Sequence, residues 1–170
     1  MTEVVVVDAE GSEVATASKF DAHRPPGMLH RAFSLFVHNP EGQILLQRRA
    51  LDKYHFAGLW ANACCSHPAP GEAVEEAVRR RVVEELGFAC DPRPVGVFTY
   101  RAEDPISGMV EHERDHVFEA TVDVDPDPDP NEIADWRWAC PTEFADRLDS
   151  DTHAPWLQMA IDRFPHLVRA

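Results

Sequence analysis

Short apolar runs separated by turns dominate the first third of the chain and predict β-hairpins. The apolar residues at 4–7 and 13–17 flank a short turn that contains glycine, which indicates two strands joined by a tight connection. A second pair of strands is expected at 32–37 and 43–48, on either side of a turn that contains proline and glycine. The uninterrupted apolar character of residues 32–37 is typical of a buried strand.

The most regular pattern in the sequence is helical and covers residues 72–86. Val74, Val78 and Val82 recur at the spacing that places them on one stripe of a helix. Acidic residues occupy the first turn, where the helix dipole favours negative charge, and Gly87 follows the last turn as a stop. A proline-rich stretch directly before this segment prevents the helix from starting earlier.

The remaining apolar segments predict three more strands and two terminal helices. The strands are expected at 95–101, 116–124 and 132–139, and the helices at 142–148 and 156–164. Strands gathered around one central helix and followed by further helices are typical of an α+β layered fold. We therefore expect a mixed β-sheet layered between α-helices, with the N-terminal hairpin added to it.

Length and composition fit one globular domain. A chain of 170 residues has the size of a single domain, which buries roughly 70% of the surface that the unfolded chain exposes, so residues 1–170 are expected to form one unit. The longest apolar runs are far shorter than the roughly 20 residues that cross a bilayer. The N-terminus lacks the features of an export signal, so we expect a cytoplasmic protein whose four cysteines are reduced.

The formal net charge of −14 restricts the partners of the protein. It argues against nucleic acid and anionic membranes, because both would be repelled at long range. A negatively charged small molecule could bind only if divalent metal and a local cluster of Lys and Arg overcame this field.

The end of the predicted central helix carries the first candidate chemistry. Glu84 and Glu85 oppose the helix dipole there, a placement explained equally well by a bound cation or by a solvated acidic helix end. Residues 66–88 resemble the Nudix signature, a loop and helix that bind metal and diphosphate. Two departures stand out, since the signature has glycine at the position of Ser66 and a glutamate important to the hydrolases at the position of Arg81. This inverted charge argues against pyrophosphate hydrolysis.

Six further motifs are spread along the chain: KFDAH at 19–23, LHRAF at 29–33, RRAL at 48–51, WANACCSHP at 60–68, YRA at 100–102 and VEHE at 110–113. Through these motifs the chain, from about residue 4 to about residue 164, resembles the type I isopentenyl-diphosphate isomerases, which have the Nudix fold and do not hydrolyse their substrate. The resemblance implies that the chain interconverts isopentenyl diphosphate and dimethylallyl diphosphate for isoprenoid biosynthesis.

The resemblance implies two divalent cations. One is held by imidazoles and carboxylates, a set that suits Mn²⁺, Zn²⁺ or Mg²⁺. The alternation of Glu111 and Glu113 places both carboxylates on one side of an extended segment. The second cation is Mg²⁺, which arrives with the substrate diphosphate and contacts Glu85. The expected ligands of the first cation are His23, His30, His67, Glu111 and Glu113.

The resemblance also assigns the proton-transfer groups. Cys65 would stand on one face of the alkene, with Glu113 and Tyr100 on the other, and the ring of Trp156 would stabilise a cationic carbon between them. The neighbouring Cys64 should point elsewhere if this segment is extended. The cations expected to bind the diphosphate are Lys19, Arg49, Lys53 and Arg81.

Two other functions remain open at this point. One is a Nudix hydrolase acting on a nucleoside diphosphate derivative, against which Arg81 and Cys65 both argue. The other is a noncatalytic metal-binding module, although structural zinc sites usually have four ligands rich in Cys, unlike the set expected here. Both a monomer and a homodimer remain compatible with the sequence.

Overall fold

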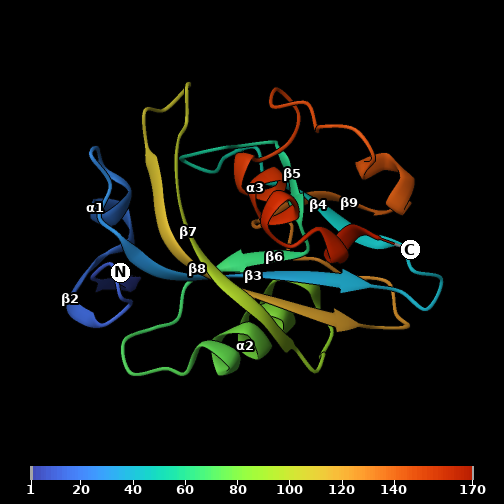
Figure 1. Ribbon diagram of the computed structural model, residues 1–170, viewed down its shortest axis with the longest axis horizontal. Helices are drawn as coiled ribbons and strands as arrows, with labels where there is room; N and C mark the ends of the chain where they lie inside the picture. Colours follow the sequence, from blue (N-terminus) through green and yellow to red (C-terminus); the bar gives the residue numbers. More distant parts are fainter. Residues whose placement is uncertain (1, 170) are drawn as a thin grey trace.

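Nine strands of the computed structural model join into one mixed sheet with three helices around it (Figure 1). The structure describes residues 2–169. The strands are β1 (Glu3–Val7), β2 (Glu13–Ser18), β3 (His30–His38), β4 (Ile44–Arg49), β5 (Trp60–Asn62), β6 (Cys64–Ser66), β7 (Arg93–Glu103), β8 (Val110–Thr121) and β9 (Ile133–Ala139). The helices are α1 (Lys19–His23), α2 (Val74–Leu86) and α3 (Pro155–Arg163), with 3₁₀ turns at Pro141–Phe144 and Pro165–Val168.

Strand β3 is the centre of the sheet. It pairs in parallel with β8 and antiparallel with β6, while β8 pairs antiparallel with β7. Near its two ends β3 also pairs with β1 of the N-terminal hairpin, through His30, and with β4, through His38. Strand β4 in turn pairs with β5 and β9. Residues of the β7–β8 hairpin therefore lie side by side with residues of β3 and β6, which are distant from the hairpin in sequence.

The two faces of the sheet are covered by different helices (Figure 1). Leu35 of β3 packs in one apolar cluster with Val78 and Val82 of α2. The next residue of the strand, Phe36, points to the opposite face and packs with Leu157 of α3. The predicted α+β arrangement, a mixed sheet between helices, is confirmed. None of the helices in the described part of the chain is long and apolar enough to cross a membrane.

The central helix agrees with the sequence pattern. It begins at Val74, two residues later than predicted, and ends at Leu86 as predicted. Gly87 ends it in the left-handed conformation, with φ of 75°. A Cβ at this position would lie 2.6 Å from the backbone oxygen of Asp127, so glycine is required both by the backbone conformation and by the close approach of that segment.

The strand predicted to begin at residue 116 begins at Val110 instead. The five residues from Glu111 to Asp115 are all charged or histidine, and their polarity hid the strand from an apolar pattern. They remain extended because β7 pairs with all five and β3 pairs with the last three, so the neighbouring strands satisfy their backbone hydrogen bonds.

Two short elements near the ends of the chain also differ from prediction. The helix expected at 142–148 is only a 3₁₀ turn, and the amide of Leu148 donates to the side-chain oxygen of Gln158 at 2.9 Å instead of to a helical carbonyl. Helix α1 was not predicted, because five residues carry too little periodicity. The Ser18 hydroxyl caps its start by accepting from the amide of Asp21.

Gly96 of β7 allows the end of α3 to approach the sheet. A Cβ at this position would lie 2.6 Å from Cε1 of Phe164, closer than van der Waals contact permits. We expect Gly96→Ala to lower the free energy of unfolding by about 1–3 kcal/mol, the usual cost of overpacking, as measured by urea denaturation. The double variant Gly96→Ala/Phe164→Leu should lose less unfolding free energy than the two single variants lose together, because the smaller side chain makes room for the new Cβ. A loss equal to that sum would show that the Phe164 ring is not the obstacle.

Candidate active site

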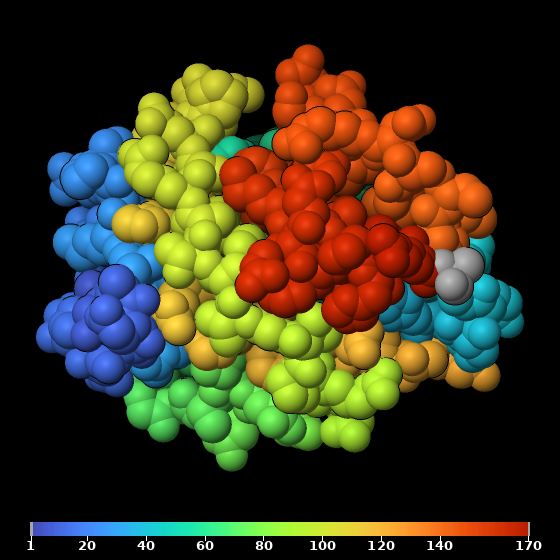
Figure 2. Space-filling model, in the orientation of Figure 1, coloured from blue at the N-terminus to red at the C-terminus, as the bar shows by residue number. Residues whose placement is uncertain are grey.

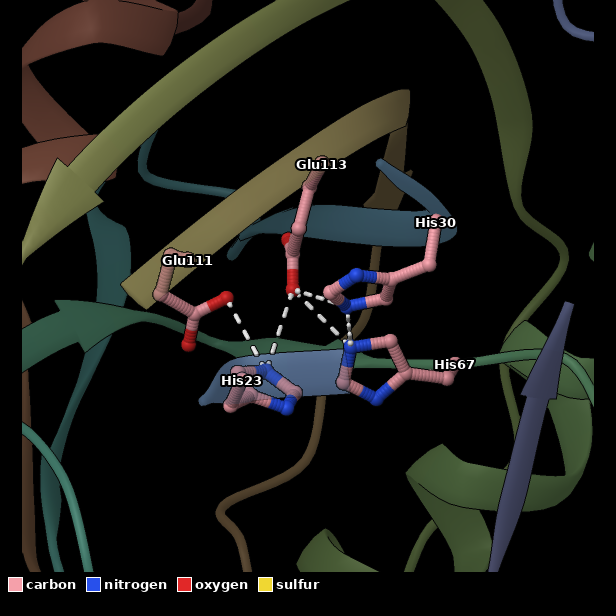
Figure 3. A group of neighbouring side chains, drawn as sticks. All are labelled: His23, His30, His67, Glu111 and Glu113. Atoms are coloured by element: carbon pink, nitrogen blue, oxygen red, sulfur yellow. Dashed lines mark hydrogen bonds and ion pairs between the residues drawn. The ribbon is translucent and has the colours of Figure 1, made fainter. Parts of the chain in front are cut away.

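Three imidazoles and two carboxylates converge at one end of the sheet (Figure 3). Each offers a nitrogen or oxygen atom, and these atoms all lie within 4.8 Å of one another. The five residues come from α1, the start of β3, the segment after β6, and β8. They are the five that the sequence predicts as ligands of one cation: His23, His30, His67, Glu111 and Glu113.

Strand register brings this group together. His30 and Glu113 are direct partners across the parallel pair β3 and β8. Glu111 lies two residues before Glu113 and is buried on the same face, as the alternation in the sequence predicts. One oxygen of Glu113, Oε1, lies 2.9 Å from Nε2 of His67 and 3.4 Å from Nε2 of His30. A single carboxylate oxygen is therefore the shared neighbour of two imidazoles.

Backbone contacts fix the tautomers of two of these histidines. Nδ1 of His23 lies 2.6 Å from the carbonyl oxygen of Lys19, and Nδ1 of His30 lies 2.8 Å from that of Met28. A carbonyl oxygen only accepts, so each Nδ1 carries the proton and each Nε2 presents a lone pair to the group. Nε2 of His23 is buried and has no hydrogen-bond partner. These donors could hold a divalent metal ion.

The electrostatics of the group favour a cation. Burial and the neighbouring His23 lower the pKa of His30 to about 4, which keeps its imidazole neutral. Burial and repulsion from Glu111 raise the pKa of Glu113 well above its usual range. Burial also opposes ionisation of Glu111, but the neighbouring Glu113, His23 and His55, of which His55 donates to its Oε1, outweigh burial and hold the pKa of Glu111 well below its usual range. A positive charge between the two carboxylates would allow both to ionise.

Tyr100 and Cys65, the other predicted proton-transfer groups, lie beside this group. Tyr100 is the direct partner of Glu113 between β7 and β8, and its hydroxyl donates to Oε2 of Glu113 at 2.7 Å. The Cys65 thiol, two residues before His67, donates to Oδ1 of Asn62 at 3.0 Å. Burial and the negative charge of Asp115 raise the pKa of Cys65, which favours the protonated thiol.

The two adjacent cysteines face opposite sides of the sheet, as expected for an extended segment. Cys64 is fully buried in the apolar cluster beneath α2. Cys65 packs instead against the cluster that contains Tyr100 and Trp156. The structure thus separates a core thiol from a thiol at the candidate site.

Four further residues of the site were not predicted. Asp115 is fully buried, and Ser34 donates to its Oδ2 at 2.7 Å while lying 3.7 Å from Sγ of Cys65. Burial raises the pKa of Asp115 to about 7. Asn62 orients the Cys65 thiol, and His55 contacts Glu111. Only the position of Asp115, two residues after Glu113 on the same face, could have been inferred from the strand pattern.

A polar cavity of about 250 Å³ opens next to the His/Glu group. Most of the predicted charged residues line it together with Cys65, whereas Tyr100, Glu113 and Trp156 lie in the interior behind it. The predicted residues in its wall are Lys19, Arg49, Lys53, Cys65, His67, Arg81 and Glu85.

A second cavity of about 480 Å³ shares Lys53 and Tyr54 with the first. It lies between the tip of the β7–β8 hairpin, at 103–107, and the segment that leads into α3. The space-filling view shows these two segments standing apart above a hollow (Figure 2).

Carboxylates already pair with several of the predicted diphosphate-binding cations. Arg81 forms an ion pair with Glu85 and a 2.7 Å contact with Glu84. Glu132 bridges two cations, since it pairs with Lys53 and lies 3.6 Å from Arg81. The predicted Mg²⁺ ligand Glu85 therefore lies against a predicted phosphate-binding arginine.

Arg49 contacts the loop between β4 and β5. Its guanidinium donates to the carbonyl oxygens of Phe56 at 3.0 Å and His55 at 3.1 Å, and lies 5.2 Å from the ring centroid of Trp156. Arg49 thus holds the loop that carries His55 and Phe56, and it also lines the polar cavity.

Comparison with known proteins agrees with this geometry. The NUDIX domain family matches residues 28–160. Among solved structures, a protein of Deinococcus radiodurans has a TM-score of 0.77 and 23% identity, covering 95% of this chain and 98% of its own. A MutT protein from Methanosarcina mazei has a TM-score of 0.69 and 20% identity, covering 84% of this chain and 96% of its own. At these identities the likeness concerns the fold alone.

Closer relatives share a more specific name. The isopentenyl-diphosphate Delta-isomerase of Halorhodospira halophila is 48% identical over 97% of this chain and 96% of the relative. The enzyme of the same name from Nocardia farcinica is 48% identical over 94% of this chain and 92% of the relative, and that of Streptomyces coelicolor is 43% identical over 96% and 84%. With this identity along nearly the whole chain, the protein belongs to the isopentenyl-diphosphate Delta-isomerase family, within the NUDIX fold.

Proposed function

We propose that this protein interconverts isopentenyl diphosphate and dimethylallyl diphosphate, acting as one catalytic unit over residues 1–170. The observation that carries the proposal is the position of Cys65 at the polar cavity, beside a buried Tyr100–Glu113 pair that is part of the His/Glu group. A hydrolase needs no such thiol. The family membership supports the same reaction.

The reaction moves a double bond by adding a proton to the terminal alkene carbon and removing one from the methylene carbon on the other side of the substituted alkene carbon, which carries the positive charge in between. An acid and a base must therefore stand within reach of the two carbons. In the proposal, Cys65 serves one face and Glu113 the other, with the Tyr100 hydroxyl relaying or orienting the proton on Glu113. The reaction is reversible, so each group donates in one direction and accepts in the other.

The burial of these groups suits a cationic intermediate. Glu113 and Tyr100 are each less than 10% exposed, so water has little access to a substrate carbon held between this pair and Cys65. The ring of Trp156 is buried in the same cluster as Tyr100, where it could stabilise positive charge on the substrate. The guanidinium of Arg49 already lies over the Trp156 ring, so in the proposal the substrate contacts the part of the ring that Arg49 does not cover.

In the proposal the His/Glu group holds Mn²⁺, Zn²⁺ or Mg²⁺, of which the imidazoles favour the first two. This cation would stabilise the ionised form of Glu113 and hold it in place for proton transfer. Glu85 would contact a Mg²⁺ ion that accompanies the diphosphate. The residues proposed to bind the diphosphate itself are Lys19, Arg49, Lys53 and Arg81.

The metal part of the proposal can be tested without substrate. We expect saturating Mn²⁺, at about 100 times its dissociation constant, to stabilise the folded protein by about 2.7 kcal/mol. For a chain of this size the unfolding temperature should rise by roughly 5–10 °C in a thermal scan, and EDTA should reverse the shift. His67→Ala should abolish the shift, while the control His166→Ala, which changes an exposed histidine, should keep it.

The catalytic part can be tested with the two adjacent cysteines. We expect Cys65→Ala to lower the rate of dimethylallyl diphosphate formation by at least about 10²–10⁴-fold, because the substrate loses one proton-transfer group. Cys64→Ala is the matched control. It alters the core on the opposite face and should retain most of the activity at a temperature where the variant is folded.

The assay supplies isopentenyl diphosphate with Mg²⁺, with and without Mn²⁺, and follows dimethylallyl diphosphate and released phosphate or pyrophosphate separately. Isomerisation without phosphate release agrees with the proposal. Phosphate release without isomerisation would identify a hydrolase and overturn it.

A further inference from the structure

His55, in the loop between β4 and β5, contacts the His/Glu group without belonging to it. The side chain is 3% exposed, and its Nε2 lies 2.5 Å from Oε1 of Glu111. An ionised carboxylate only accepts hydrogen bonds, so Nε2 of His55 must carry the proton and donate it to Glu111. The imidazole of His55 thus donates a hydrogen bond to one of the five residues that could hold a metal ion.

This hydrogen bond decides which oxygen of Glu111 faces the group. With Oε1 engaged by His55, Oε2 is buried and has no hydrogen-bond partner. It lies 3.5 Å from Nε2 of His23, which is also buried and unpartnered (Figure 3). Two polar atoms without partners therefore point at each other, which is the arrangement expected where both would bind one cation.

The loop holds the His55 ring in this orientation. The carbonyl oxygens of His55 and Phe56 both accept from Arg49, and the amide of Phe56 donates to Oδ2 of Asp104 at 2.9 Å. The ring of Tyr54 stacks on His55, with 4.4 Å between centroids. Contacts on the backbone and on the ring face leave the imidazole little freedom, so its donor has a fixed direction.

From this geometry we infer that His55 is an outer-sphere positioning residue, which holds Glu111 in the orientation that binds the divalent cation of the His/Glu group. The inference deepens the proposed function and rests on it only in taking this cation as the catalytic one. A donor behind a metal-binding carboxylate fixes the ligand and typically contributes 10–100-fold to metal affinity.

The test measures the dissociation constant of Mn²⁺, without substrate, for two variants at position 55. His55→Leu fills a similar volume but has no donor, and we expect it to weaken Mn²⁺ binding about 10–100-fold. His55→Gln can place an amide N–H near the position of Nε2, and should restore the affinity to within a few-fold of the unaltered protein. A purely structural role would not separate these two variants by metal affinity.

His116→Ala is the matched control. This residue is a half-buried histidine on β8 whose position alternates with those of Glu111 and Glu113, so it faces the other side of the strand. Its Mn²⁺ affinity should remain within about twofold of the unaltered protein. Equal affinities for His55→Leu and the unaltered protein would overturn the inference.

A second measurement uses the unaltered protein and does not depend on any variant folding. In the Zn²⁺-loaded protein, ¹⁵N-resolved NMR of the imidazoles should show Nε2 of His55 protonated and protected from exchange. An unprotonated Nε2 of His55 would overturn the inference, because it could not donate a hydrogen bond to Glu111.

The two proposals fail separately. Weaker Mn²⁺ binding in His55→Leu, together with no isomerisation by the unaltered protein, would sink the proposed function and leave the role of His55 intact. Isomerisation by the unaltered protein, together with unchanged Mn²⁺ affinity in His55→Leu, would support the proposed function and overturn the role of His55.

Discussion

Two carboxylates buried side by side on β8 set the main constraint on this structure. Negative charge is costly to bury unless donors or cations surround it, and Glu111 and Glu113 are each only 5% exposed. Polar groups from five other segments surround them, namely three imidazoles of the group, the Tyr100 hydroxyl and the outer imidazole of His55. Strand register, helix α1 and the loop after β4 all contribute to this one requirement.

The charge distribution around the polar cavity follows from the same requirement. The chain carries a net charge of −14, yet four Lys and Arg side chains line one small cavity. Glu85 and Glu132 hold Arg81 and Lys53 in this arrangement through ion pairs. The cations are thus preorganised by local carboxylates, and a diphosphate with its own divalent ion could join this network without neutralising the whole molecule.

Much of the site could be predicted because strands display every second residue on one face. This rule alone placed Glu111 with Glu113 and turned Cys64 away from Cys65, and the structure bears out both. The same polarity that marked the site concealed the start of β8, whose pairing on both sides outweighs the lack of apolar residues. His55 could not be predicted, since its contact with Glu111 joins a loop to a distant strand and leaves no periodic signal in the sequence.

The distribution of the His/Glu group along the chain also orders events during synthesis. His23 and His30 leave the ribosome early, but their partners on β8 follow only after the central helix and β7 have been made. The parallel pairing of β3 with β8 is a long-range contact, which forms only when most of the chain is available to close the loop. A nascent chain can therefore complete the His/Glu group only late, so a metal ion bound there, as proposed, would report that the central sheet has been completed.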